Sequence, residues 1–139
     1  MAETSILWLR VAAVLYSLGL LHAILTLIRK RQYLFRIALG AFSLAAVLHG
    51  VSVVDQGIIT GHFPANNVFE SLSLCALLIT LLFLFLYRRY KLESLSVFIF
   101  PLVFVMTLMA SLANPVSEWP SAAVRDTLLK VHVVLVLLG

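Results

Sequence analysis

Apolar residues follow one another along this chain in long, unbroken runs, without the alternation of a half-buried strand. Four such runs of 18 to 19 residues are almost free of charge: Val11–Ile28, Ile37–Val54, Val68–Leu86 and Leu95–Leu112. A bilayer has a hydrocarbon core about 30 Å thick, which a helix crosses with roughly 20 apolar residues. Runs of this length and uniformity do not fit the alternating strands of a membrane barrel. We therefore predict an all-α, polytopic transmembrane helix bundle.

A fifth apolar run begins at Thr127 and reaches the last residue, Gly139. As a helix it is roughly 20 Å long, which is too short to cross the hydrocarbon core. It also ends without a polar or basic stop. We therefore expect four complete spans plus a truncated fifth, with residues 1–139 forming the N-terminal part of a single larger transmembrane domain.

Basic residues gather in two of the short connections between these runs. Seven of the ten lie there: Arg29, Lys30, Arg31, Arg36, Arg88, Arg89 and Lys91. Short loops rich in lysine and arginine remain on the cytoplasmic side. The N-terminus, the 55–67 loop and the 113–126 loop are therefore predicted to face outward. The net charge of +4 follows from this topology, and no nucleic-acid partner is expected.

Composition removes several other classes of protein. Apolar residues make up 63% of the chain and charged residues 12%, against roughly 25% charged in a soluble domain. The single cysteine, Cys75, excludes an internal disulfide and any multi-cysteine metal site. The sequence also has no Gly-rich phosphate loop, no His-Glu-x-x-His pair and no Gly-x-Ser-x-Gly elbow.

The histidines are the first functional candidates, because ionisable groups at membrane depth are costly. His22 and His49 fall inside predicted spans, His62 in an outer loop, and His132 near the start of the fifth run. A neutral imidazole can ligate haem iron or relay protons. The plain alternative is a histidine paired with a neighbouring helix or hydrated at the interface. No two share a helix at a spacing of three or four, so a pair of ligands has to converge from different elements.

The densest polar segment is 61–71, at the start of the third run. Asn67 and Glu70 have the spacing of a capping box, in which each side chain bonds the other residue's backbone amide. Asn67, Ser71 and Cys75 recur every four residues, with Glu70 beside them, and predict one polar stripe facing other helices. Two interpretations remain open: a well-capped, packed helix, or an outer end that lines a pocket for a polar or charged ligand.

Two stretches carry a family resemblance. The first is Gly61-His62-Phe63-Pro64 followed by Asn67-Val68-Phe69-Glu70-Ser71-Leu72, and the second is Leu129-Lys130-Val131-His132-Val133-Val134. In order, spacing and side of the membrane they resemble the CcsA-type cytochrome c assembly family, which includes HemX-like and YpjD-like membrane proteins. The resemblance covers this whole chain but only about the first half of such a protein.

This resemblance implies a haem-handling protein of cytochrome c biogenesis, active where haem is attached to apocytochrome c outside the bacterial cytoplasmic membrane. His132 matches the family's outer haem-ligating histidine, an axial ligand of non-covalent b-type haem. The second ligand and the tryptophan-rich haem loop are expected outside this sequence. Pro64, Asn67, Glu70 and Ser71 match the pattern and are interpreted as supports of the outer pocket. No catalytic residue is assigned, and a haem-delivery factor is expected rather than a classical enzyme. The implied partners are haem, apocytochrome c and a second membrane assembly subunit.

Two other functions fit the same residues. One is a non-catalytic accessory or regulatory membrane protein of HemX or YpjD type. The other is a transporter or quinone-site subunit that uses His22 and His49 as a proton relay.

Overall fold

The computed structural model describes residues 2–61, 63–112 and 131. In these residues the chain is all-helical, with α1 (Glu3–Arg29), α2 (Gln32–Thr60), α3 (Val68–Tyr90), the short 3₁₀ helix η1 (Glu93–Leu95) and α4 (Ser96–Ser111). Four helices, the last including η1, are long and apolar enough to cross a membrane, which confirms the four predicted spans. The fifth run lies outside the described residues, apart from Val131, which is helical.

The first two helices are longer than their apolar runs. The first helix begins at Glu3 rather than near Val11, and α2 ends at Thr60 rather than near Val54. Gly61 then stops α2 in the left-handed conformation at φ 67°, where a glycine has no steric penalty. These extra turns project a set of polar side chains beyond the apolar segments, and the candidate site is built from them.

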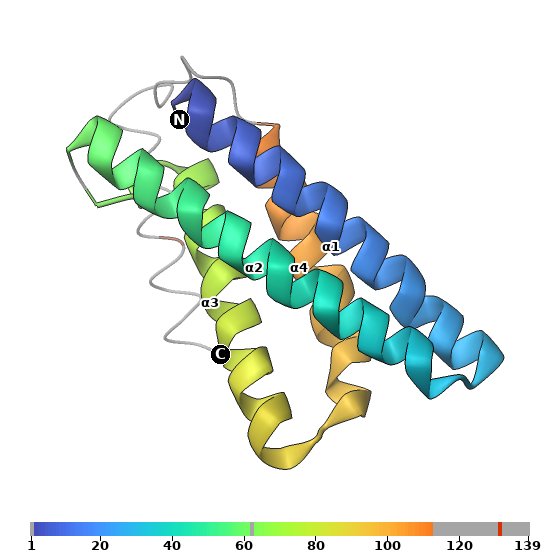
Figure 1. The fold of residues 1–139 in the computed structure, drawn as a ribbon. Helices are drawn as coiled ribbons and strands as arrows, with labels where there is room; N and C mark the ends of the chain where they lie inside the picture. Colours follow the sequence, from blue (N-terminus) through green and yellow to red (C-terminus); the bar gives the residue numbers. More distant parts are fainter. Residues whose placement is uncertain (1, 62, 113–130, 132–139) are drawn as a thin grey trace.

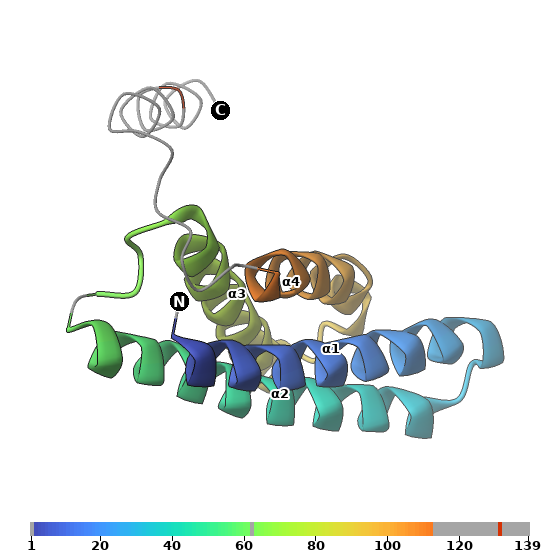
Figure 2. The same cartoon turned by 90° about the horizontal axis from the view of Figure 1, so that it is seen from above.

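The helices form two antiparallel hairpins. In Figures 1 and 2, α1 and α2 run side by side as one layer, and α3 and α4 lie across one face of that layer. The N-terminal end of α1, the C-terminal end of α2 and the start of α3 meet at one end of the bundle, which we call the Glu70 end (Figure 1). The opposite end carries Arg29, Arg31, Arg88 and Lys91 and is called the basic end.

Small residues and aromatic rings pack the middle of the bundle. Ala12, Ala38 and Ala45 are fully buried and allow α1 and α2 to approach closely. Phe42 of α2 stacks on Phe100 of α4 with ring centroids 3.5 Å apart. Lipid tails are as apolar as these side chains, so close van der Waals packing and interhelical hydrogen bonds hold such a bundle together.

Large apolar side chains cover the outside of the bundle. Val14, Phe85 and Phe98 are 59%, 66% and 75% exposed, respectively. Contiguous apolar surface of this kind marks a surface that contacts membrane or other protein rather than water. Together with the length of the helices, it supports a multi-pass membrane protein.

Candidate functional site

Glu70 is the buried acid around which the Glu70 end is organised. It lies in the first turn of α3 and is only 3% exposed. Its backbone N–H donates to Asn67 Oδ1 at 2.9 Å, which confirms the first half of the predicted capping box. The second half is wrong, because Glu70 Oε2 accepts from the Asn66 N–H at 2.9 Å and not from the amide of Asn67. The carboxylate is displaced from the box geometry because its other oxygen is bound to α2.

That second partner is Gln56, which joins three helices. Gln56 Nε2 donates to Glu70 Oε1 at 2.8 Å. Its Oε1 accepts from the Ala2 N–H and from Ser5 Oγ, each at 2.7 Å. Gln56 is 1% exposed, and its contacts with Ser5 and Glu70 are buried. One amide therefore ties the start of α1 to the end of α2 and the start of α3.

The surroundings explain how a carboxylate tolerates this burial. Two N–H donors, from Gln56 and Asn66, point at the two oxygens of Glu70. Hydrogen bonds to a charged acceptor are roughly twice as strong as neutral ones. Glu70 also lies at the N-terminus of α3, where the helix dipole favours negative charge. Both oxygens of the Glu70 carboxyl group are thus hydrogen-bonded within the bundle.

A second layer of polar contacts lies one turn deeper in the bundle. Ser52 Oγ donates to the backbone oxygen of Ser5 at 2.6 Å, which again joins α2 to α1. His49 is fully buried, and its Nε2 lies 2.9 Å from Ser73 Oγ of α3. For His49, the plain alternative of pairing with a neighbouring helix is confirmed.

The polar contacts end at Tyr16. Its hydroxyl lies 3.4 Å from His49 Nδ1 and donates to Thr80 Oγ1 at 3.4 Å. Thr80 Oγ1 in turn donates to the backbone oxygen of Ala76 at 2.8 Å. The Tyr16 ring then packs on Phe42, with centroids 4.8 Å apart, where the aromatic core begins. This polar column therefore runs from the Glu70 end to the middle of the bundle and stops at apolar side chains.

The other predicted support residues gather at the start of α3. Pro64, Asn67 and Ser71 are all half-buried. Ser71 Oγ donates to the Ala65 backbone oxygen at 3.4 Å, so it helps to hold the loop against the helix. Residues 63–71 thus form a capped junction between a loop and α3.

The predicted polar stripe holds for Glu70, which is buried, but is wrong for Cys75. Cys75 is exposed on the outside of the bundle. The polar residues that α3 turns inward are Glu70, Ser73 and Thr80. Residues spaced strictly by four move gradually around a helix that has 3.6 residues per turn. Glu70, Ser73 and Thr80, spaced by three and then seven residues, stay on the buried face.

The remaining histidines are not among the residues found in the polar column. His22 is half-buried, and its Nδ1 contacts the Leu18 backbone oxygen of its own helix at 2.8 Å. No contact within the described residues joins His22 to His49. His62 and His132 lie outside the described residues.

The described residues contain no group of three His, Cys, Asp or Glu side chains arranged for a metal ion. Both ring nitrogens of His49 face hydroxyl partners, and both oxygens of Glu70 face N–H donors. Neither His49 nor Glu70 therefore has an unpaired polar atom within the described residues.

Sequence reasoning missed five members of this cluster: Ser5, Tyr16, Gln56, Ser73 and Thr80. The spacing of His49, Ser52 and Gln56 already indicates one face of a helix, because residues three and four apart are neighbours. The sequence predicts Gln56 in a loop because the apolar run Ile37–Val54 ends before it. The helix continues through it, and the polar face continues with it.

Comparison with known proteins returned no match, either to a family model, to a curated protein or to a solved structure.

Proposed function

We propose that this chain is a haem-binding and haem-presenting membrane protein of cytochrome c biogenesis, active where haem is attached to apocytochrome c. The observation that carries the proposal is the cluster at the Glu70 end. Asn67 and Glu70, which carry the resemblance to the CcsA-type family, cap α3 and lock it to α2 and α1. A cofactor site needs a rigid frame of this kind, because ligands must be held close to their productive geometry.

In this proposal each residue has a distinct role. His132 gives the axial bond to iron from the start of the fifth run. Lys130 and Arg125, close to it in sequence, neutralise the haem propionates. Glu70, with Asn67, Pro64 and Ser71, keeps the neighbouring helix ends in place. The thioether chemistry belongs to haem and the apocytochrome cysteines, so the contribution of the protein is ligation and presentation.

The orientation in the membrane is part of the proposal. The basic end faces the cytoplasm, because short lysine- and arginine-rich connections are retained there. The Glu70 end and the N-terminus then face the outer side of a bacterial cytoplasmic membrane. This is the side on which apocytochrome c and a second assembly subunit meet the site.

The experiment compares three purified full-length proteins in detergent: the parent, His132→Ala and His22→Ala. His22 is the matched control, since its imidazole hydrogen-bonds a backbone oxygen of its own helix. We expect a haem absorption band in the parent and in His22→Ala, and a lost or shifted band in His132→Ala. Equal haem content in all three proteins rules out His132 as the ligand.

A second candidate is an accessory protein that stabilises a membrane partner and binds no haem. It is favoured by one observation: Glu70 and His49 are satisfied within the bundle and leave no free polar group for a ligand. A colourless parent that refuses hemin and co-purifies with an assembly subunit in equal amounts supports this second function.

A further inference from the structure

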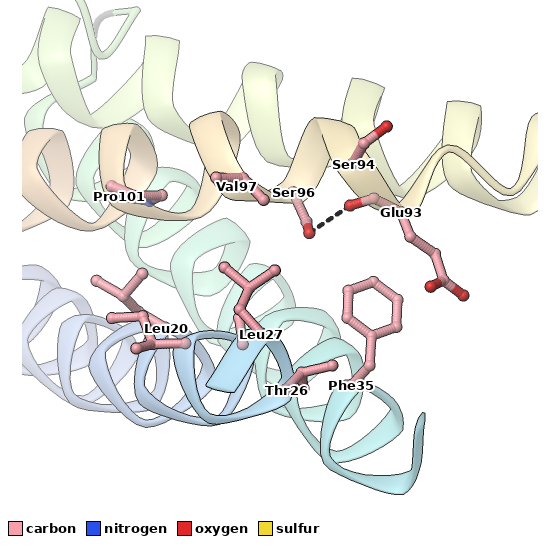
Figure 3. A pocket seen from close by; sticks show the side chains of 11 residues that line it. Leu20, Thr26, Leu27, Phe35, Glu93, Ser94, Ser96, Val97 and Pro101 are labelled. Carbon is pink, nitrogen blue, oxygen red and sulfur yellow. Dashed lines mark hydrogen bonds between the residues drawn. The ribbon is translucent and has the colours of Figure 1, made fainter. Parts of the chain in front are cut away.

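Two hollows open at the basic half of the bundle, where the hairpins diverge. One lies between α1 and α4, measures about 160 Å³ and is lined by Leu20, Leu27 and Val97 (Figure 3). The other lies between α2 and α3 and measures about 380 Å³. Each is far larger than the space one water needs. We call the second the α2–α3 groove.

The walls of the α2–α3 groove are mostly apolar, and the hydroxyl of Ser43, which also lines it, donates to the Leu39 backbone oxygen of its own helix at 2.8 Å. Ala46 and Val47 line it from α2, and Leu81, Leu84 and Phe85 line it from α3. Val47 and Phe85 are 63% and 66% exposed, so the groove opens sideways onto the surface that faces lipid. A hydrocarbon chain lying against these side chains gains the contacts that the diverging helices leave unmade.

One charged residue, Arg88, lies at the end of this groove. Arg88 lines it from the last turn of α3, seven residues beyond Leu81, or about 10 Å along the helix. Its guanidinium has no hydrogen bond, ion pair or aromatic partner among the described residues. Its neighbours differ: Arg89 lies 5.7 Å from the centre of the Tyr90 ring, and Lys91 lies 5.1 Å from that of Tyr87. Arg88 is therefore an unpaired cation at the mouth of an apolar groove.

We propose that the α2–α3 groove binds an anionic phospholipid, with its phosphate on Arg88 and one acyl chain between α2 and α3. A guanidinium binds phosphate oxygens through two parallel hydrogen bonds, and the groove below it accepts the chain. The hollow between α1 and α4 does not fit this ligand, because Glu93 lines it and repels a phosphate (Figure 3). This proposal is independent of haem binding.

The test measures how the purified full-length protein, in mixed bilayers, selects phosphatidylglycerol over phosphatidylcholine. The variants are Arg88→Gln and Arg89→Gln, which remove the same charge one residue apart. Both lose the general attraction of a basic surface for anionic lipid. We expect Arg88→Gln to bind phosphatidylglycerol about tenfold more weakly than Arg89→Gln, as the loss of a charged hydrogen bond predicts.

A second pair of variants tests the groove without changing any charge. Val47→Trp places a large ring in the groove, whereas Val54→Trp places it two turns away at a position of similar exposure, 60%. We expect Val47→Trp alone to lower the retention of phosphatidylglycerol. The proposal is overturned by a parent without selectivity, by equal losses in the two arginine variants, or by equal retention in the two tryptophan variants.

Discussion

Replacing Glu70 with alanine should weaken the contacts that join α1, α2 and α3 at the Glu70 end. The expected loss in the free energy of unfolding follows from the hydrogen bonds that Glu70 accepts. In Glu70→Ala, the N–H groups of Gln56 and Asn66 lose their acceptor inside a buried cluster. Each hydrogen bond to a charged group contributes about 1.5–3 kcal/mol in soluble proteins. In membrane proteins the average is nearer 0.6 kcal/mol, with a maximum of about 1.7, because unfolded segments also find partners. With two bonds lost in a membrane protein, we expect about 1–3.5 kcal/mol of destabilisation.

A double-mutant cycle isolates the central contact. Glu70→Ala, Gln56→Ala and the double variant are unfolded in detergent by titration with a denaturing surfactant, and helicity is followed by far-ultraviolet circular dichroism. We expect a coupling free energy of about 1–1.5 kcal/mol between the two residues.

The chain provides a matched control pair for this cycle at the basic end. Gln32 Nε2 and Glu93 Oε2 form an exposed contact of 3.5 Å between the same two residue types. Because the contact is long and exposed, its coupling should stay below about 0.5 kcal/mol. Equal coupling energies in the two pairs refute the argument that the buried Glu70–Gln56 contact holds the three helices together.

Two further pairs test the packing of the bundle in the same unfolding assay. Gly19→Ala should destabilise the protein by about 1–3 kcal/mol, because a Cβ at this position lies 2.5 Å from Phe42 Cδ2. Gly40→Ala is the control: its Cβ meets open space, so the variant should be as stable as the parent or more stable by up to about 1 kcal/mol. The reverse order of stabilities contradicts the packing of α1 on α2. Thr107 Oγ1 is buried without a hydrogen-bond partner among the described residues, so Thr107→Val should stabilise the protein by about 1 kcal/mol. Thr80→Val should destabilise it by a similar amount, because this variant loses the hydrogen bonds to Tyr16 and Ala76. A loss of stability in Thr107→Val argues against the unpaired hydroxyl.

The apolar runs predicted the spans because the bilayer imposes a simple rule. Every backbone group must be satisfied within the segment, so a long apolar run in lipid forms a helix. The rule fails at the ends, where Ser5 and Gln56 lie outside the apolar runs but inside α1 and α2. There the helices are extended by contacts between side chains, and hydropathy along one segment carries no information on those contacts.

In the candidate site, too, the local features could be predicted from the sequence and the contacts between helices could not. The spacing of Asn67 and Glu70 predicted the bond from the Glu70 N–H to Asn67 Oδ1 correctly, since both partners lie within one turn, but it did not predict that the Glu70 carboxylate bonds Asn66 instead of Asn67. The link from Glu70 to Gln56 depends on how α2 crosses α3, and the polar face of α3 depends on which side meets α1 and α2. Local spacing does not determine either of these tertiary features. The proposed ligand, His132, stays a prediction.

The most direct test of the account is a hemin titration of the purified full-length protein in detergent. We expect saturable binding of one haem per chain, with an absorption spectrum that differs from hemin in protein-free micelles. A protein that stays colourless, and in which added hemin partitions as it does into empty micelles, contradicts the proposal that this bundle presents haem.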